Sequence, residues 1–182
     1  MGEIMEERMI FAGAGGQGLM LLGKLTALAA TRDDLHVTWF PSYGAEVRGG
    51  TAHCHVVVSA SEIFSPLVEE ASTLLIMNEP SLKRFLPRLA PGGLLVLNTS
   101  LASAPADIDA EFLAVPATDM ANKLGNIKIA NMVMLGALNT RKRLVKYDTL
   151  WAAIVEYAGT RRAELVELNR KAYDLGKKAA EA

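Results

Sequence analysis

The segment that follows the first apolar run has the residue types and spacing of a phosphate-binding loop. Met9-Ile10-Phe11 leads into Ala12-Gly13-Ala14-Gly15-Gly16-Gln17-Gly18. Within it, Gly13, Gly15 and Gly18 match the Gly-x-Gly-x-x-Gly fingerprint of dinucleotide-binding folds. Glycines at this spacing permit a tight turn, let a diphosphate approach the backbone, and leave N–H groups free at the start of the next helix.

A dinucleotide site also needs a carboxylate at the end of the second strand, where it holds the ribose. That position falls near Phe40-Pro41-Ser42, which has no acid, and Asp33 and Asp34 precede the strand. The loop therefore leaves three interpretations open, although the missing acid argues against the first. They are a bound NAD or FAD, contact with a phosphate or a partner protein, and close packing alone. The candidate binding residues of this loop are Gly13, Gly15, Gly16, Gln17 and Gly18.

A second glycine-rich loop carries charges and follows the second strand. Loops at the carboxyl ends of parallel strands form the ligand crevice of an open α/β sheet, so both loops are expected on one rim. Arg48 could present a fork of donors to a carboxylate or phosphate, with Glu46 as a partner that orients it. The alternative is that both are solvated loop charges. The candidate binding residues of this loop are Tyr43, Glu46, Arg48, Gly49 and Gly50.

The remaining reactive side chains form no catalytic or metal-binding constellation. His53 and His55 alternate with Cys54 along a strand, so the histidines share one face and the thiol lies on the other. One cysteine cannot supply the four thiolates of an iron–sulfur cluster. No serine or cysteine has a base at a spacing that would activate it. We therefore predict no catalytic residue, no metal site and a buried, apolar role for Cys54.

Alternating strand and helix patterns predict an α/β protein, a Rossmann-like three-layer sandwich with a mostly parallel sheet and a helical C-terminal region. Residues 1–182 are predicted to form a single domain. The predicted strands are 8–12, 35–40, 52–59, 74–77, 94–97 and 111–115. The predicted helices are 16–31, 79–89, 117–124, 126–139, 147–158 and 161–180. The helix over 126–139 is apolar nearly all round, which favours burial in the domain or against another subunit.

Composition excludes several classes of function. Hydrophobic residues make up 51% and charged residues 21% of the 182 residues, with a net charge of −1. No basic excess would attract nucleic acid or an anionic membrane. No apolar run approaches the roughly 20 residues that span a bilayer. The acidic N-terminal segment lacks the basic start of a signal peptide, so a cytoplasmic location is expected.

Several segments, taken in order, carry a resemblance to a known family. They are Gly13–Gly18, Pro41–Ala52, Ile63–Val68, Met77-Asn78, Pro91-Gly92-Gly93, Asn98-Thr99-Ser100, Gly125-Asn126 and Asn131–Gly136. Together they cover nearly the whole chain, and they resemble the γ subunit of the 2-oxoacid:ferredoxin oxidoreductases. The ordered set is specific, whereas the first glycine loop alone is not. The form of Tyr43–Gly50 is most similar to the 2-oxoglutarate branch, and branched-chain 2-oxoacid enzymes are close to it.

The resemblance implies a subunit of a complex that converts a 2-oxoacid, coenzyme A and oxidised ferredoxin into an acyl-CoA, carbon dioxide and reduced ferredoxin. It places thiamine diphosphate and Mg between α and β subunits and iron–sulfur clusters in β or a small δ subunit. The expected partners are those subunits and, through the complex, ferredoxin. No cofactor is expected on this chain, and coenzyme A is the expected substrate. An isolated chain with a bare docking face would favour a homodimer.

We hypothesise that the two glycine-rich loops face the catalytic subunits and the path of coenzyme A. Two other interpretations remain open from the sequence. One is a free-standing nucleotide-binding protein of the Rossmann type. The other is an assembly scaffold that contacts no ligand.

Overall fold

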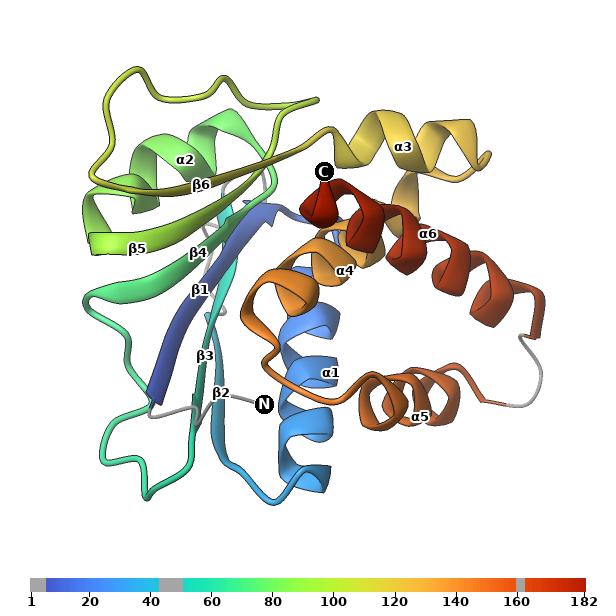
Figure 1. Cartoon of the computed structure of the whole chain (residues 1–182), viewed down its shortest axis with the longest axis horizontal. Helices are drawn as coiled ribbons and strands as arrows, with labels where there is room; N and C mark the ends of the chain where they lie inside the picture. Colours follow the sequence, from blue (N-terminus) through green and yellow to red (C-terminus); the bar gives the residue numbers. More distant parts are fainter. Residues whose placement is uncertain (1–5, 43–50, 160–162) are drawn as a thin grey trace.

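The computed structural model describes residues 6–42, 51–159 and 163–182. It contains one six-stranded sheet with helices on both faces (Figure 1). The strands are β1 (Glu6–Ala14), β2 (His36–Ser42), β3 (Thr51–Ser59), β4 (Ala71–Ile76), β5 (Leu89–Asn98) and β6 (Ala110–Val115). The α-helices are α1 (Leu19–Arg32), α2 (Glu79–Phe85), α3 (Ala117–Lys123), α4 (Ala130–Lys142), α5 (Tyr147–Ala158) and α6 (Ala163–Glu181). Two short 3₁₀ turns are η2 (Leu86–Arg88) and η3 (Ile127–Ile129).

The strand order is β2-β3-β1-β4-β5-β6, and one strand is reversed. β1, β4, β5 and β6 are parallel to one another, whereas β3 is antiparallel to both β1 and β2. The reversal follows from the short connection between β2 and β3, residues 43–50, because a parallel crossover needs a dozen residues or more. Since β1 and β2 both run against β3, they end at the same edge of the sheet. The mostly parallel sheet predicted from the sequence is confirmed, with β3 as its exception.

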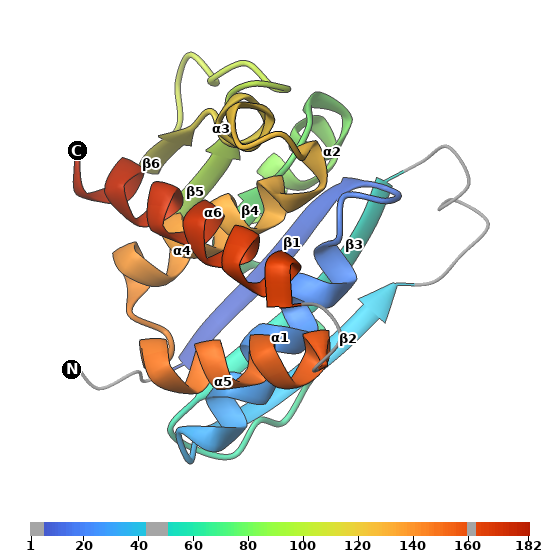
Figure 2. The same ribbon diagram turned by 90° about the vertical axis from the view of Figure 1, so that its right-hand side faces the viewer.

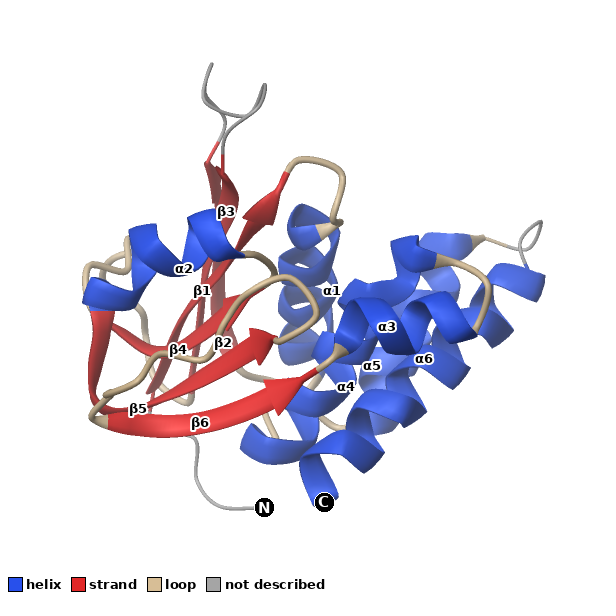
Figure 3. Ribbon diagram, turned by 90° about the horizontal axis from the view of Figure 1, so that it is seen from above, coloured by secondary structure: helices blue, strands red, loops and turns tan. Residues whose placement is uncertain are grey.

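The sheet is the middle layer of three (Figure 3). Met9 and Phe11 of β1 belong to the core beneath α1 and α4, whereas Ile10 and Ala12 belong to the core beneath α2. Successive residues of β1 are therefore buried on opposite faces, which explains why this strand reads as an uninterrupted apolar run. The three-layer α/β fold predicted from the sequence is confirmed.

Helix α4 lies between the sheet and α6, as Figures 1 and 2 show from two directions. Its ten residues Ala130–Asn139 are all buried, so the predicted burial of this helix is confirmed within the fold itself. Two glycines let α4 and α6 approach each other closely. A Cβ on Gly136 would collide with the backbone carbonyl of Tyr173, and a Cβ on Gly176 would collide with that of Val133.

Several element boundaries differ from the predictions. α1 begins at Leu19 rather than at residue 16, because Gly16 and Gly18 have positive φ angles. The predicted helix over 79–89 is shorter, since α2 ends at Phe85 and β5 already begins at Leu89. Asn126 caps a 3₁₀ turn before α4, its Oδ1 accepting the Lys128 N–H at 3.0 Å. No helix within the described ranges is long and apolar enough to cross a membrane.

Candidate functional site

The first glycine loop forms a tight turn between β1 and α1. The Gln17 N–H donates to the Ala14 carbonyl at 3.2 Å. Gly16 has φ +88° and Gly18 has φ +77°, a region in which residues with a Cβ are strained. Gly18 is also the N-cap residue of α1 and supplies no side chain to cap the first turn. The first N–H groups of α1 are therefore left without a side-chain partner.

Two residues of the loop have structural partners. Gln17 folds back so that its Oε1 accepts the Ala14 N–H at 2.6 Å. A Cβ on Gly13 would lie 2.8 Å from the Met77 Cβ, so this position needs glycine for close packing. The packing interpretation accounts for these two residues.

Asn131 at the start of α4 supports the loop from behind. Its Nδ2 donates to the Gly18 carbonyl at 3.4 Å, and its side chain occupies the space that a Cβ on Gly18 would enter. Asn131 is 5% exposed, and the sequence analysis assigned it no role in the site. The available signal was its polar side chain on an otherwise apolar helix.

Gly16 differs from Gly13 and Gly18 because it faces open space. A Cβ built on it would meet no atom of the described residues within 4 Å. Gly15 and Gly16 line a cavity on each side of the loop. The outer turn of the loop is therefore accessible to a second molecule.

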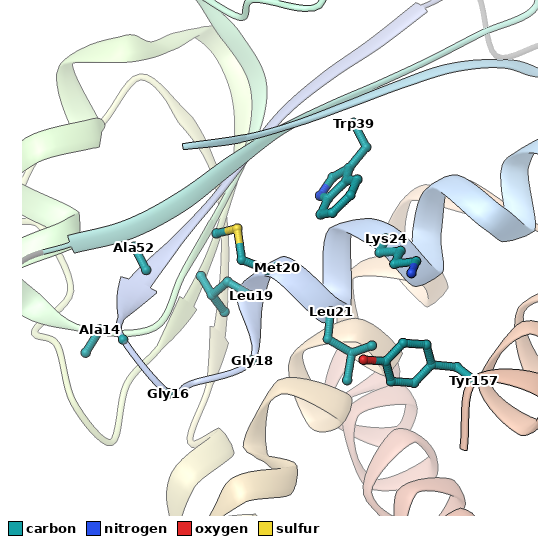
Figure 4. A pocket seen from close by; sticks show the side chains of 11 residues that line it. Ala14, Gly16, Gly18, Leu19, Met20, Leu21, Lys24, Trp39, Ala52 and Tyr157 are labelled. Atoms are coloured by element: carbon teal, nitrogen blue, oxygen red, sulfur yellow. The ribbon is translucent and has the colours of Figure 1, made fainter. Parts of the chain in front are cut away.

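The larger cavity, about 500 Å³, extends from the glycine loop along α1 (Figure 4). Lys24 of α1, Trp39 of β2 and Tyr157 of α5 line it, and the Lys24 Nζ lies 5.5 Å from the centroid of the Tyr157 ring. Lys24 is the one charged side chain among the described residues that line this cavity. An ammonium, a helix N-terminus and aromatic faces suit a ligand that combines an anion with a flat ring.

The sequence analysis did not predict Lys24, Trp39 or Tyr157. They come from three elements that only the tertiary fold brings together, although Lys24 was visible as the one charged residue of the segment 16–31.

The smaller cavity, about 260 Å³, lies on the other side of the loop. Gly16 and Met77, at the ends of β1 and β4, line it together with Leu101, Ile127 and Lys128. α1 and α2 leave these two strands toward opposite faces, so this is the switch point at which open α/β sheets bind ligands.

A buried amide fixes the wall of this crevice. Asn98 at the end of β5 donates from Nδ2 to the Met77 carbonyl at 3.1 Å and to the Thr118 Oγ1 at 2.9 Å. Its Oδ1 accepts the Thr118 N–H at 3.3 Å. One side chain therefore joins the ends of β4 and β5 to the start of α3.

The second predicted loop falls outside the described residues, and with it Tyr43, Glu46, Arg48, Gly49 and Gly50. Its flanks are described. Ser42 pairs with His53, and Thr51 pairs with Ala14, the last residue of β1. The chain therefore enters and leaves the second loop beside the first.

The histidines and the cysteine lie as predicted, on opposite faces of β3. The His53 ring packs on Phe85 of α2 at 4.8 Å between centroids, whereas Cys54 is fully buried in the core beneath α1. Burial raises the pKa of the Cys54 thiol to about 12, so it is no nucleophile. Burial, with the nearby Arg88, lowers the pKa of His55 to about 4, and its Nδ1 accepts the Val68 N–H at 3.0 Å. The described part of the chain holds no group of three or more potential metal ligands.

Comparison with known proteins agrees with this α/β fold. Residues 8–179 match the model of the family described as pyruvate ferredoxin/flavodoxin oxidoreductase. The chain is 32% identical over 174 residues to the ketoisovalerate oxidoreductase subunit VorA of Methanothermobacter thermautotrophicus, covering 96% of this chain and 36% of VorA. It is 34% identical over 158 residues to the 2-oxoglutarate synthase subunit KorC of Methanothermobacter marburgensis, covering 82% of this chain and 85% of KorC.

A solved structure, the γ subunit of a keto/oxoacid ferredoxin oxidoreductase from Geobacter sulfurreducens, superposes with a TM-score of 0.84 and 29% identity. The match covers 96% of this chain and 98% of that one. The class defined by the fold is thus that of the Rossmann-like γ domains. The chain belongs to the pyruvate ferredoxin/flavodoxin oxidoreductase family, and the resemblance predicted from its sequence is confirmed. It spans about a third of the length of the VorA relatives that it matches.

Proposed function

We propose that this chain is the γ subunit of a cytoplasmic, thiamine-diphosphate-dependent 2-oxoacid:ferredoxin oxidoreductase. In this role it packs on the αβ core and forms part of the coenzyme A site. One observation carries the proposal. The open turn of the glycine loop, the start of α1 and Lys24 share one cavity, and the residues that flank the second loop, Ser42 and Thr51, lie at the same edge.

The cavity offers what the phosphate-bearing part of coenzyme A needs. Glycines without side chains let a diphosphate approach the backbone, and the N–H groups of the first turn of α1 would bind it. Lys24 would add a charge-assisted contact, and Trp39 and Tyr157 present aromatic faces for the adenine. Arg48, with Glu46 orienting it, is proposed to hold coenzyme A or a partner subunit from the second loop.

The other cofactors fit partner subunits rather than this chain. The sequence has one cysteine, and that thiol is buried. Thiamine diphosphate, Mg and the iron–sulfur clusters are therefore assigned to the α, β and, where present, δ subunits, where they would supply decarboxylation and electron transfer. Ferredoxin would be reached through the complex.

We propose 2-oxoglutarate as the 2-oxoacid, with succinyl-CoA, carbon dioxide and reduced ferredoxin as products. The match to KorC supports this choice, because it covers 82% of this chain and 85% of KorC. The VorA match, in contrast, accounts for 36% of a longer chain. A branched-chain 2-oxoacid is the alternative, and assays of the purified complex with both substrates decide between them.

The coenzyme A site is tested by kinetics of the reconstituted complex. Lys24→Ala and Arg48→Ala are each expected to raise the KM for coenzyme A about tenfold or more, the loss typical of one charge-assisted contact. The KM for the 2-oxoacid should stay unchanged. Lys178→Ala, an exposed lysine of α6, is the control and should leave both constants unchanged.

Two outcomes would replace the proposal. An unchanged KM for coenzyme A at an unchanged complex mass removes Lys24 and Arg48 from the site. A lower yield of complex with normal kinetics favours the assembly scaffold. The cavity also suits a free nucleotide, so the isolated chain is titrated with NAD(H), NADP(H) and FAD. Micromolar binding without assembly would establish a free-standing nucleotide-binding protein instead.

A further inference from the structure

The crevice on the far side of the glycine loop has exposed apolar margins. Ile127 of η3 is 60% exposed and Leu101, after β5, is 43% exposed, and both line the crevice of about 260 Å³. Met77, also in the lining, is 1% exposed. Water thus contacts two large apolar side chains around an apolar depression, which marks an interaction site rather than an ordinary surface.

The size of the crevice favours a protein side chain over a cofactor. Small-molecule sites usually measure about 300–1,000 Å³, and this one is smaller. Protein interfaces, in contrast, are anchored by single large side chains that fill pockets of this kind while surrounding residues exclude water. Leu101 and Ile127 lie at the margin of the crevice, where they would exclude water from around such an anchor.

Charge at the margin defines the partner further. Lys128 lies beside Ile127 and lines the crevice. It is exposed, and within residues 6–42, 51–159 and 163–182 no carboxylate forms an ion pair with it. A carboxylate on the incoming chain would complement it and steer the approach.

We propose that this crevice receives an apolar anchor side chain of the αβ core, leucine, methionine or phenylalanine, with an acidic residue beside it that pairs with Lys128. The inference rests on the proposed function and specifies its docking surface. The crevice shares the glycine loop with the proposed coenzyme A cavity, so it continues the same rim. In VorA the matching part is 36% of the chain, so further polypeptide accompanies this unit there.

The test measures association between this chain and the separately purified remaining subunits of its complex. Leu101→Asn and Ile127→Asn are each expected to raise the Kd about tenfold or more. The matched control is Leu67→Asn, the same change at a leucine that is 48% exposed in the connection between β3 and β4, and it should shift the Kd less than twofold. Lys128→Glu should weaken association at low salt, with an effect that shrinks as salt rises. Circular dichroism and the Tm of each variant confirm the fold.

Each outcome decides the inference separately from the proposed function. If the wild-type chain assembles and the crevice variants bind as tightly, the docking surface is wrong and the γ-subunit assignment stands. If they assemble normally but raise the KM for coenzyme A, the crevice is a ligand subsite and the docking proposal is overturned. If Leu67→Asn weakens association as much as the crevice variants do, the effect is not specific to the crevice and the docking proposal is overturned. If the wild-type chain fails to assemble at all, both proposals fail.

Discussion

Glycine serves two opposite purposes in two regions of this molecule. Where α4 crosses α6, the space beside Gly136 and Gly176 is filled by the backbone of the other helix. In the glycine loop, Gly16 has a positive φ, and no atom in the described part of the chain lies within 4 Å of its Cβ position. The first region uses glycine to bring two backbones together, whereas the second uses it to keep a turn open.

The difference separates architecture from function. A glycine whose Cβ position is occupied from within the chain is explained by packing. A glycine that is open on all sides is explained by its turn conformation and by what approaches from outside. Gly13 and Gly18 belong to the first kind, because Met77 and Asn131 fill the space beside them. Gly16 is therefore the position in the loop where a functional effect is expected without a packing effect.

The largest predicted effect is at the helix crossing. In Gly176→Ala the new methyl group would meet the Val133 carbonyl carbon at 2.7 Å and the Ala137 nitrogen at 3.0 Å, so the helices must separate. We expect a loss in the free energy of unfolding at or above the upper end of the roughly 1–3 kcal/mol seen for overpacked cores. Urea denaturation measures it. Lys178→Ala on the same helix should change the free energy of unfolding by less than about 0.5 kcal/mol. A Gly176→Ala variant as stable as wild type would show that the packing of α4 on α6 does not depend on glycine.

Acid should destabilise the whole fold through His55, independently of either glycine region. Its folded-state pKa of about 4 lies below the ordinary value of 6.5, so the unfolded chain binds the extra proton first. Stability should therefore fall as pH drops from about 6.5 to 4, by roughly 1 kcal/mol per pH unit. Denaturation of wild type and of His55→Gln across this range isolates the contribution. If the free energies of unfolding of the two proteins change with pH in parallel, His55 is not the cause of the acid sensitivity.

An intermediate effect is expected where packing and loop meet. Asn131→Ala removes the donor to the Gly18 carbonyl and should cost about 1–2 kcal/mol. Gly18→Ala alone adds a clash with the Asn131 amide to the strain of its positive φ. In the double variant the clash is relieved, so the combined loss should be smaller than the sum of the two. Strict additivity would show that Asn131 does not support the loop.

The sharpest effect on function is expected at Gly16, with a loss of stability no larger than that of Asn131→Ala. Gly16→Ala and Gly92→Ala both place a methyl group in open space at positive φ, +88° and +70°. Each should cost about 1–2 kcal/mol of backbone strain. Only Gly16→Ala should raise the KM for coenzyme A in the assembled complex. An equal change in KM for both variants would show that strain alone, rather than the open turn, is responsible.

Local pattern predicted most of the fold, because each element carries its own signal. All six predicted strands and all six predicted α-helices are present, and the apolar helix is buried over Ala130–Asn139, whereas Ile127 before it is exposed. The reversed β3 was not predicted, although the short connection that forces it was visible in the sequence. The shortened α2 was missed because β5 begins at Leu89, which pairs with Ala71 of β4, and continues through Pro91-Gly92-Gly93.

The candidate site was predictable only where it is local. The glycine loop follows directly from its spacing, and the strand ends that flank the two loops meet at one edge as expected. Lys24, Trp39 and Tyr157 meet from α1, β2 and α5, and no local pattern relates them. The support of Gly18 by Asn131 spans 113 residues of sequence, so it exists only in the folded chain.

Cys54, the single thiol of the chain, can report on the opening of the packing between α1 and the sheet. Cys54 is fully buried and its high pKa keeps it protonated, so reagents that attack thiolates reach it only when the packing of α1 on the sheet opens. The rate of alkylation therefore depends on the fraction of molecules in which this packing is open. Because no other cysteine in this chain competes, peptide mass analysis could follow the stability of this chain even in a mixture with other thiol-containing proteins.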